Sequence, residues 1–347
     1  MFCDHKEFSN HEMVIVCRDE AAGLSGLIAI HSTTAGPAMG GCRISAYQTE
    51  DEAITDVLRL SRGMTYKNVM AGLPFGGGKA VIVADPHTEK TPQLLRAFAT
   101  RVDRLGGTFI TGEDIGTTVA DIETMRAVTS HVRGIPENGP GDPSPMTALG
   151  VFAGIQAAVG HQLKIPNLKG VRVIVQGLGA VGVRLAKMLN DAGARLIVSD
   201  IDHERVMRVC DRFGATAASP ESCHAEEADV FAPCARGAIL SKETIEDLRV
   251  SVVAGAANNQ LATSRDGQRL MDRGILYAPD YVINAGGVIS TALEGPSFDG
   301  TILLERVHRI ADLLREIFHR ADAEAIPTSV MADRMAEERL AKLRTQQ

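Results

Sequence analysis

The sequence predicts an α/β protein of two domains, the second of them built on a doubly wound parallel sheet. Three observations support this fold class. Short β-rich runs alternate with helical patterns along most of the chain. A segment dense in proline and glycine interrupts the alternation at residues 134–145. Beyond it, glycines at positions 177, 179 and 182 follow one β-rich run directly and open a helix, as the first turn of a doubly wound sheet requires.

The first half of the chain predicts an α/β layer. We expect strands at residues 27–31, 79–83 and 108–111, and helices at residues 50–70, 91–105 and 119–132. The segment at 134–145 cannot continue a helix or a central strand, because its prolines lack the backbone donor. We therefore place a hinge and a domain boundary there.

The second half predicts a helix at residues 147–159 and then a series of short strands at residues 171–175, 195–199, 228–232, 250–254, 275–278 and 281–283. A helix at 180–192 separates the first two strands, as a parallel sheet requires. Two helical patterns, at 302–323 and 330–343, close the chain on either side of Pro327. We expect a first domain at 1–134 that includes the C-terminal helix at about 328–347, and a second domain at 145–327.

Composition narrows the class of protein. A chain of 347 residues exceeds the roughly 250–300 at which single cores stop growing, and 45% apolar with 23% charged residues is typical of a soluble globular protein. No apolar run reaches the roughly 18 residues of a membrane span, and the N-terminus lacks the apolar region of a signal peptide. The net charge of −7 disfavours nucleic acid as a partner. We expect a cytoplasmic protein.

The cysteines predict no metal site. The six cysteines, at positions 3, 17, 42, 210, 223 and 234, form no C-x-x-C pair and no zinc-type ladder with histidines. We expect reduced thiols and no bound metal.

The sequence Gly177-Leu178-Gly179-Ala180-Val181-Gly182 is a complete G-x-G-x-x-G motif between a strand and a helix. Its first glycine allows a tight turn, its second lets the backbone approach a pyrophosphate, and its third lets helix and strand pack closely. The amides at the start of the helix would hold the phosphates. These features predict a Rossmann domain that binds a dinucleotide. The alternative is a glycine-rich turn that binds no ligand.

Asp200 ends the next predicted strand, about 20 residues after the motif, as dinucleotide sites require. Its carboxylate would accept hydrogen bonds from the adenosine ribose and repel a 2′-phosphate, which favours NAD over NADP. Arg205 is a nearby residue that could weaken this preference. If the turn binds no ligand, Asp200 is a surface residue.

Lys67 and Lys79 flank a glycine-rich stretch, Gly76-Gly-Gly-Lys79, that resembles a phosphate-binding P-loop only in part. Leu73 stands where the P-loop needs glycine, and Ala80 stands where it needs serine or threonine. We expect instead a flexible turn whose glycines let a substrate approach the backbone. Lys79 would project from the start of the following strand into a partly dry cleft, where burial favours the neutral amine and makes it a usable acid/base.

Two further residues have both a functional and a structural explanation. Lys67 ends a predicted helix, where the helix dipole alone favours a lysine by roughly 0.3–1 kcal/mol. Asp114 follows the strand predicted at 108–111, at an edge where α/β sheets gather active sites, but it could equally cap the next helix or stabilise a turn. Two lysines, an acid and a nicotinamide site in one chain would suit hydride transfer at a carbon that bears an amine and a carboxylate.

The chain resembles the amino-acid dehydrogenase family that contains the glutamate, leucine, valine, phenylalanine and tryptophan enzymes. The resemblance extends over nearly the whole chain and rests on the segments at residues 36–41, 62–67, 76–79, 113–118, 144–147, 231–234, 254–261 and 278–287. It implies an N-terminal substrate domain, a C-terminal NAD-binding domain, a cleft between them that closes on the substrate, and assembly into homo-oligomers.

The resemblance also implies a role for each site residue. Lys67 would bind the substrate α-carboxylate, and Lys79 would activate the water that attacks the iminium left by hydride transfer. Asp114 would carry protons to and from the amine. A substrate ammonium would keep Lys79 deprotonated by like-charge repulsion, while Asp114 would offset the excess positive charge. The further residues that the resemblance implies are Gly40, Gly41, Asn258 and Asn259 at the substrate and Thr147, Cys234 and Asn284 at the cofactor.

The substrate side chain is expected to be uncharged, because Met39 stands where the glutamate enzymes carry a lysine. The resemblance implies a side-chain pocket formed by Met39, Gly112, Val288 and Thr291. Gly112 would enlarge this pocket, as in the aromatic enzymes, whereas the segments around Glu113 and Ser144 are more similar to the leucine and valine enzymes. A methylene or two separates such substrates by only roughly 1–3 kcal/mol. We expect leucine-type specificity, with an aromatic substrate as the alternative.

Two other classes of protein remain as alternatives. One is an inactive NAD-binding regulatory protein, which the presence of Lys67, Lys79 and Asp114 disfavours. The other is a 2-hydroxy-acid dehydrogenase, which would need a histidine–carboxylate pair that His31 and His131 do not provide.

Overall fold

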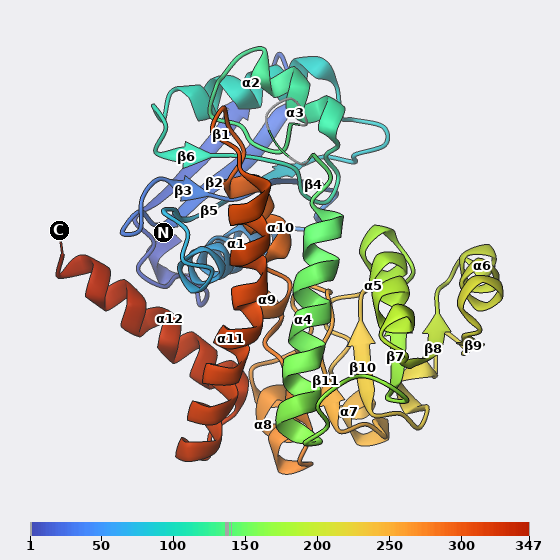
Figure 1. The fold of residues 1–347 in the computed structure, drawn as a ribbon. Helices are drawn as coiled ribbons and strands as arrows, with labels where there is room; N and C mark the ends of the chain where they lie inside the picture. Colours follow the sequence, from blue (N-terminus) through green and yellow to red (C-terminus); the bar gives the residue numbers. More distant parts are fainter. Residues whose placement is uncertain (1, 136–138, 140, 347) are drawn as a thin grey trace. The chain divides into compact units, whose positions relative to one another are not determined.

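The computed structural model describes residues 2–135, 139 and 141–346, and the chain divides into two compact units (Figure 1). Unit 1 comprises Met1–Asp142, Thr291–Phe298 and Ala336–Gln347, and unit 2 comprises Pro143–Ser290 and Asp299–Met335. The predicted domains differ from these units in that residues 291–298 were expected in the second domain and residues 328–335 in the first. Part of the predicted hinge, residues 136–138 and 140, lies outside the described residues.

Unit 1 contains a mixed six-stranded sheet. Its order is β1 (Met13–Asp19), β2 (Leu24–Ser32), β5 (Gly76–Val83), β3 (Ala38–Met39) and β6 (Phe109–Ile110), with β4 (Cys42–Ser45) pairing with β5 off this path. The β1–β2 and β2–β5 pairs are antiparallel, and the remaining pairs are parallel.

Helices cover both faces of this sheet (Figure 1). The alternation of side chains along β2 shows how: Ile28 and Ile30 pack with α2 (Pro92–Asp103) and α3 (Val119–Arg126), whereas Leu27 and Ala29 pack with α1 (Glu50–Met70). Along β5, Ala80 and Ile82 likewise face α2 and α3, and Val81 faces α1. The unit begins with the 3-10 helix η1 (Phe2–Asp4).

The helix predicted at 119–132 ends earlier than expected. It begins at Val119, where Thr118 and Asp121 form a capping box, but it stops at Arg126. The chain must then return to the sheet, where Thr111 forms a parallel bridge with Val132. The predicted end of this helix was therefore wrong.

Unit 2 contains a six-stranded parallel sheet in the order β12-β11-β10-β7-β8-β9. Numbered from its first strand, this order is the 3-2-1-4-5-6 arrangement of a doubly wound Rossmann sheet. The strands are β7 (Arg172–Gln176), β8 (Arg195–Ser199), β9 (Thr216–Ala217), β10 (Val230–Pro233), β11 (Val252–Val253) and β12 (Leu276–Tyr277).

The second half of the chain also forms helices. These are α4 (Ser144–Gln162), α5 (Ala180–Asp191), α6 (His203–Phe213), η3 (Cys223–Ala225), α7 (Lys242–Asp247), α8 (Arg265–Asp272), α9 (Asp280–Ile283), α10 (Gly286–Ala292), α11 (Gly300–Glu324) and α12 (Thr328–Arg344). The strand predicted at 281–283 was wrong, because these residues form α9. A three-residue apolar run cannot distinguish the two structures by period. None of the helices in the described part of the chain combines the length and apolar composition that crossing a bilayer requires.

Candidate active site

Lys67 lies half-buried in the last turn of α1, a helix that its own sequence defines at both ends. Thr49 caps the N-terminus by accepting from the Glu52 backbone N–H, and acidic residues fill the first turn. At the other end, the Asn68 amide donates to the carbonyls of Gly76 at 2.6 Å and Met39 at 3.3 Å. These bonds fix the end of the helix that carries Lys67 against β3 and β5.

The glycines before Lys79 form part of a strand, so the predicted flexible turn was wrong. A Cβ on Gly76 would lie 1.9 Å from the Ser32 carbonyl oxygen, and one on Gly77 would lie 2.0 Å from the Thr65 nitrogen. A Cβ on Gly78 would lie 2.8 Å from the Phe109 ring. The space beside each glycine is filled by the protein itself, and the glycines allow β5 to pack closely against its neighbours.

Lys79 is the fourth residue of β5, and strand alternation places it on the α1 side with Val81. The residue is only 7% exposed. A charged side chain at such a site needs a partner, and Lys79 Nζ forms an ion pair with Asp114 Oδ2. The structure thus brings together the two residues predicted to carry the proton transfers.

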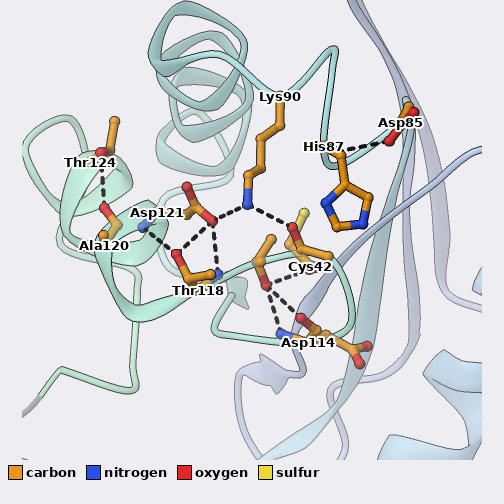
Figure 2. A network of polar contacts seen from close by, with 11 residues as sticks. Cys42, Asp85, His87, Lys90, Asp114, Thr118, Ala120, Asp121 and Thr124 are labelled. Carbon is orange, nitrogen blue, oxygen red and sulfur yellow. Dashed lines mark hydrogen bonds and ion pairs between the residues drawn. The ribbon is translucent and has the colours of Figure 1, made fainter.

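Asp114 lies in the loop between β6 and α3 (Figure 2). Hydrogen bonds with Thr117 fix this loop. The Asp114 backbone N–H donates to Thr117 Oγ1 at 2.8 Å, and the Thr117 hydroxyl lies 3.1 Å from the Cys42 carbonyl oxygen. Gly41 allows the loop to come close, because a Cβ there would lie 2.4 Å from the Glu113 carbonyl oxygen. The helix cap in this region is Thr118, so Asp114 does not serve as one.

The Lys90 side chain also holds this loop and connects it to α3 (Figure 2). Lys90 Nζ donates to the Gly116 carbonyl at 3.0 Å and to Asp121 Oδ2 at 2.7 Å. Because Asp121 also belongs to the capping box of α3, Lys90 connects the loop to the start of that helix.

Two cations determine the charge of Asp114. Burial alone would raise the pKa of this carboxyl group, but the Lys79 ammonium and the Arg43 guanidinium outweigh burial and hold the pKa below its ordinary value. Arg43 Nε lies 3.6 Å from Asp114 Oδ2. Arg43 is not among the site residues predicted from the sequence. The signal that could have identified it is its charge: Arg43 lies inside the short strand Cys42–Ser45, and this strand directly follows Gly40 and Gly41.

The other residues predicted for the substrate side of unit 1 lie on β3 or in the segments that directly follow β3 and β6. Met39 is buried in β3. A Cβ on Gly40 would lie 1.9 Å from the Gly78 carbonyl oxygen, and one on Gly112 would lie 3.1 Å from the Arg133 carbonyl oxygen. Close backbone approach thus accounts for Gly40, whereas Gly112 is only tightly placed, and their contact with a substrate stays a prediction.

In unit 2, the glycine motif forms a turn that leaves room for a phosphate. Gly177 has a φ of +95°, and a Cβ on Gly182 would lie 1.8 Å from the Gly177 carbonyl oxygen. At Gly179, by contrast, a Cβ would meet nothing within 4 Å, and this residue starts α5 without a side-chain cap. The space and the uncapped amides at Ala180 and Val181 fit a pyrophosphate group.

Asp200 follows β8 and lies against this turn, with a side chain that is 7% exposed. Its Oδ2 accepts the Leu178 backbone N–H at 2.6 Å, and its Oδ1 accepts the Asp202 N–H at 2.8 Å. Asp200 therefore holds the glycine turn, whether or not it also binds a ribose. Arg205 Nε pairs with Asp202 Oδ2 at 3.1 Å, while Arg205 Nη1 lies 3.9 Å from Asp200 Oδ2.

A groove of about 410 Å³ continues from the turn between α5 and α6. It is lined by Leu178, Gly179, Ala180, Val183, Arg205, Arg208, Val209, Arg212 and Phe213. Its lining of apolar residues and arginines leaves space beside the turn in which a dinucleotide could extend.

Asn284 and Asn258 form the part of unit 2 that would suit a carboxamide. Asn284 Nδ2 donates to Asn258 Oδ1 at 2.8 Å and to the Ala256 carbonyl at 3.1 Å. Asn284 Oδ1 is buried and accepts no hydrogen bond within the described part of the chain. An amide N–H of a nicotinamide would satisfy this acceptor.

The neighbouring predicted residues have structural partners. The Thr147 hydroxyl donates to the Pro143 carbonyl at 3.0 Å, and the Cys234 backbone N–H donates to the Gln176 carbonyl at 2.7 Å. Asn259 adopts a φ of +52° and is exposed, and its carbonyl accepts the Ala238 N–H at 2.7 Å. These contacts distinguish the asparagines, because the side chain of Asn258 reaches Asn284 whereas Asn259 shapes a turn.

Val288 and Thr291 lie on α10, one turn apart and each half-buried. Val288 belongs to unit 2, whereas Met39 and Gly112 belong to unit 1. The four-residue side-chain pocket therefore stays a prediction.

Unit 2 contains a doubly wound sheet whose glycine turn fits a phosphate, and unit 1 contains a buried lysine–carboxylate pair. These are the parts of a dinucleotide-dependent dehydrogenase. Comparison with known proteins gives the same class. The family described as Glu/Leu/Phe/Val dehydrogenase, dimerisation domain, matches residues 7–131, and the family described as Glutamate/Leucine/Phenylalanine/Valine dehydrogenase matches residues 139–207 and 201–298.

Individual relatives match over nearly their full lengths. Leucine dehydrogenase of Geobacillus stearothermophilus is 46% identical over 342 residues, which cover 98% of this chain and 93% of that protein. Phenylalanine dehydrogenase of Bacillus thermotolerans is 44% identical, over 96% of this chain and 90% of that protein. The crystal structure of L-tryptophan dehydrogenase from Nostoc punctiforme is 44% identical and superposes with a TM-score of 0.86, over 97% of each chain. The chain belongs to the Glu/Leu/Phe/Val dehydrogenase family, whose members are NAD(P)-dependent amino-acid dehydrogenases.

Proposed function

We propose that this protein catalyses the NAD-dependent oxidative deamination of an apolar L-amino acid of the leucine type, and the reverse reductive amination. The observation that carries the proposal is the buried ion pair between Lys79 and Asp114 in a member of this family. The amino acid, NAD⁺ and water give the 2-oxo acid, ammonium, NADH and a proton.

In this proposal, Lys67 binds the α-carboxylate. Thr147 and Asn284 would hold the nicotinamide, which would supply the acceptor for the hydride that leaves Cα. Lys79 activates the water that attacks the resulting iminium, and Asp114 takes up and returns the amine proton. Lys79 must lose its own proton before it can act as a base. A substrate ammonium beside it favours that loss by like-charge repulsion, and the ionised carboxylate of Asp114 offsets the excess positive charge.

Leucine-type specificity is supported by the leucine dehydrogenases among the relatives and by Met39, which offers no charge to an acidic side chain. The phenylalanine and tryptophan dehydrogenases among the relatives make an aromatic substrate the second candidate. The order of substrate preference can be tested by measuring NADH formation at alkaline pH with leucine, valine, phenylalanine, tryptophan and glutamate. We expect leucine or valine to give the highest kcat/KM, and a preference for glutamate would overturn this part of the proposal.

NAD rather than NADP is supported by Asp200, whose carboxylate beside the glycine turn would repel a 2′-phosphate. Asp200→Asn keeps an acceptor for the Leu178 N–H but removes the charge. We expect this variant to lower the ratio of NAD to NADP kcat/KM by about tenfold or more, since one charge contact is worth roughly 1.4 kcal/mol or more. Asp191→Asn, a change on the exposed end of α5, is the control. An unchanged ratio would contradict the ribose contact.

We also propose that the protein assembles into homo-oligomers and acts on small molecules alone. The support for assembly is the description of the family domain at residues 7–131 as a dimerisation domain. Sedimentation of the purified 37.0 kDa chain should give a multiple of that mass.

A further inference from the structure

Arg43 contacts two carboxylates from its place in β4. Its Nη1 donates to Asp56 Oδ2 at 2.8 Å, and its Nε lies 3.6 Å from Asp114 Oδ2. The Arg43 side chain is 17% exposed, and its Nε is buried and makes no hydrogen bond to any described residue. Because 3.6 Å is too long for a hydrogen bond, Arg43 acts on Asp114 through its charge.

Asp56 and Tyr47 keep the guanidinium in this position. The Tyr47 hydroxyl donates to Asp56 Oδ2 at 2.6 Å, on the same oxygen that accepts from Arg43. Burial, followed by the contact with Asp56, raises the pKa of Tyr47, so its hydroxyl remains a donor. An arginine without this anchor could turn to form a two-point pair with Asp114, which would compete with Lys79 for the carboxylate.

The two cations beside Asp114 differ in one respect that matters during turnover. Under the proposed function, on which this inference rests, Lys79 must give up its proton to act as a base. Its charge then disappears from the neighbourhood of Asp114. The guanidinium of Arg43 stays charged throughout the pH range of an enzyme.

We propose that Arg43, anchored by Asp56 and Tyr47, is a positioning residue that keeps Asp114 ionised and its carboxylate turned toward Lys79 while Lys79 loses its proton. Arg43 itself touches neither substrate nor cofactor in this proposal. Its effect reaches the reaction through Asp114.

The other titratable groups near Asp114 do not supply a constant positive charge. Cys42 of β4 is fully buried, and burial raises the pKa of its thiol, which keeps it neutral. Glu113 is the neighbour in the loop, and burial followed by nearby carboxylates raises its pKa. Asp121 of α3 is paired with Lys90.

The test is the pH dependence of kcat/KM for amino-acid oxidation in Arg43→Met. Removing the positive charge raises the pKa of Asp114 and of any other acid beside it, so more alkaline solution is needed to reach the active protonation state. We expect the acid limb of the profile to move up by about one pH unit. Arg43→Lys keeps a positive charge, so its acid limb should lie close to that of the wild type. Its rate should be lower, because an ammonium cannot reach both carboxylates.

Lys90→Met is the matched control, since Lys90 fastens the same loop but places its ammonium on Asp121 and on the Gly116 carbonyl. A purely structural disturbance of the loop would lower the rate and leave the acid limb in place. The proposal is overturned if Arg43→Met leaves the limb unmoved, or if Lys90→Met moves it equally.

Asp56→Asn is a second variant, for which the acid limb should shift in the opposite direction, and it serves if Arg43→Met fails to fold. Removing the Asp56 charge frees Arg43 to approach Asp114, so the acid limb should move to lower pH. An unmoved or raised limb would contradict the proposal. If the wild-type protein oxidises no amino acid at all, the proposed function fails, whereas an active wild type with unmoved variants refutes the role of Arg43 alone.

Discussion

At the scale of single residues, the Lys79–Asp114 pair is better explained by chemistry than by stability. Bringing two charges out of water costs several kcal/mol per ion, and their attraction repays this only with good geometry and further partners. The Asp114 carboxylate has such partners in the Ile115 backbone N–H, which donates to Oδ1 at 2.7 Å, and in the Arg43 guanidinium. The loop that carries Asp114 is held in place by Thr117 and Lys90. A site with this many fixed contacts around one buried pair is typical of groups whose protonation states matter.

Replacing Lys79 by alanine should remove turnover while leaving cofactor binding intact. General acid–base groups contribute typically 10²–10⁴-fold, so we expect a loss of that order in kcat. The dinucleotide turn lies in unit 2 and is untouched by the change, so the Kd for NADH, followed by fluorescence, should stay within about twofold of the wild type.

The matched control for Lys79→Ala is Lys187→Ala, because Lys187 is exposed on α5 and pairs only locally with Asp191. It should retain the wild-type rate. Retention of most of the rate by Lys79→Ala would remove the assigned role of Lys79.

At the scale of elements, helix α1 and strand β5 show what sequence patterns can and cannot predict. The bounds of α1 were predicted correctly, because the cap at Thr49, the acidic first turn and the apolar spacing all agree. The start of β5 was missed, because glycine has low strand propensity and only the packing of Gly76, Gly77 and Gly78 against neighbouring backbone makes them a strand. Arg43 was missed for a related reason, since its carboxylate partners lie on other elements, Asp56 on α1 and Asp114 in the loop after β6.

The close packing of α1 on β5 predicts opposite effects for two glycine substitutions. Gly77→Ala would place a Cβ 2.0 Å from the Thr65 nitrogen, and we expect it to lower the free energy of unfolding by at least about 3 kcal/mol, the upper end of usual overpacking costs. Gly63→Ala, within α1, meets nothing within 4 Å and should raise that free energy by about 0.5–1 kcal/mol. Urea unfolding measures both. Equal effects would contradict the packing role of the β5 glycines.

The contact between β2 and α1 also predicts a pH dependence of stability. His31 is buried, its Nδ1 lies 2.9 Å from Thr65 Oγ1, and its ring packs edge-on against His11 at 4.9 Å. Burial first, and then His11, lower the pKa of His31 from 6.5 to about 4. The unfolded chain therefore binds a proton that the folded protein excludes between these values.

Stability from His31 is thus complete above about pH 6.5 and is lost as the pH falls toward 4, by roughly 3 kcal/mol in all. His31→Gln should flatten the free energy of unfolding over this window. His203→Gln, at an exposed position of α6, should leave the slope unchanged. Parallel curves for His31→Gln and the wild type would contradict the buried neutral histidine.

At the scale of the whole molecule, the proposed function divides the chemical tasks between the two units. Unit 2 provides the dinucleotide turn, Asp200 and the asparagine pair, and unit 1 provides the lysines and Asp114. The Rossmann sheet could be predicted because strand, glycine motif, helix and acid agree at one place in the sequence. The mixed sheet of unit 1 could be predicted only in part, since β3 and β4 are short strands that depend on pairing with β5. The cleft between the predicted domains stays a prediction.

The most direct test of the central claim is to measure NADH and ammonium together as the purified wild-type protein oxidises L-leucine with NAD at alkaline pH. Oxidative deamination releases both products in equal amounts, and we expect one ammonium for each NADH throughout the reaction. NADH without ammonium, or no NADH from any amino acid of the panel, would contradict the account.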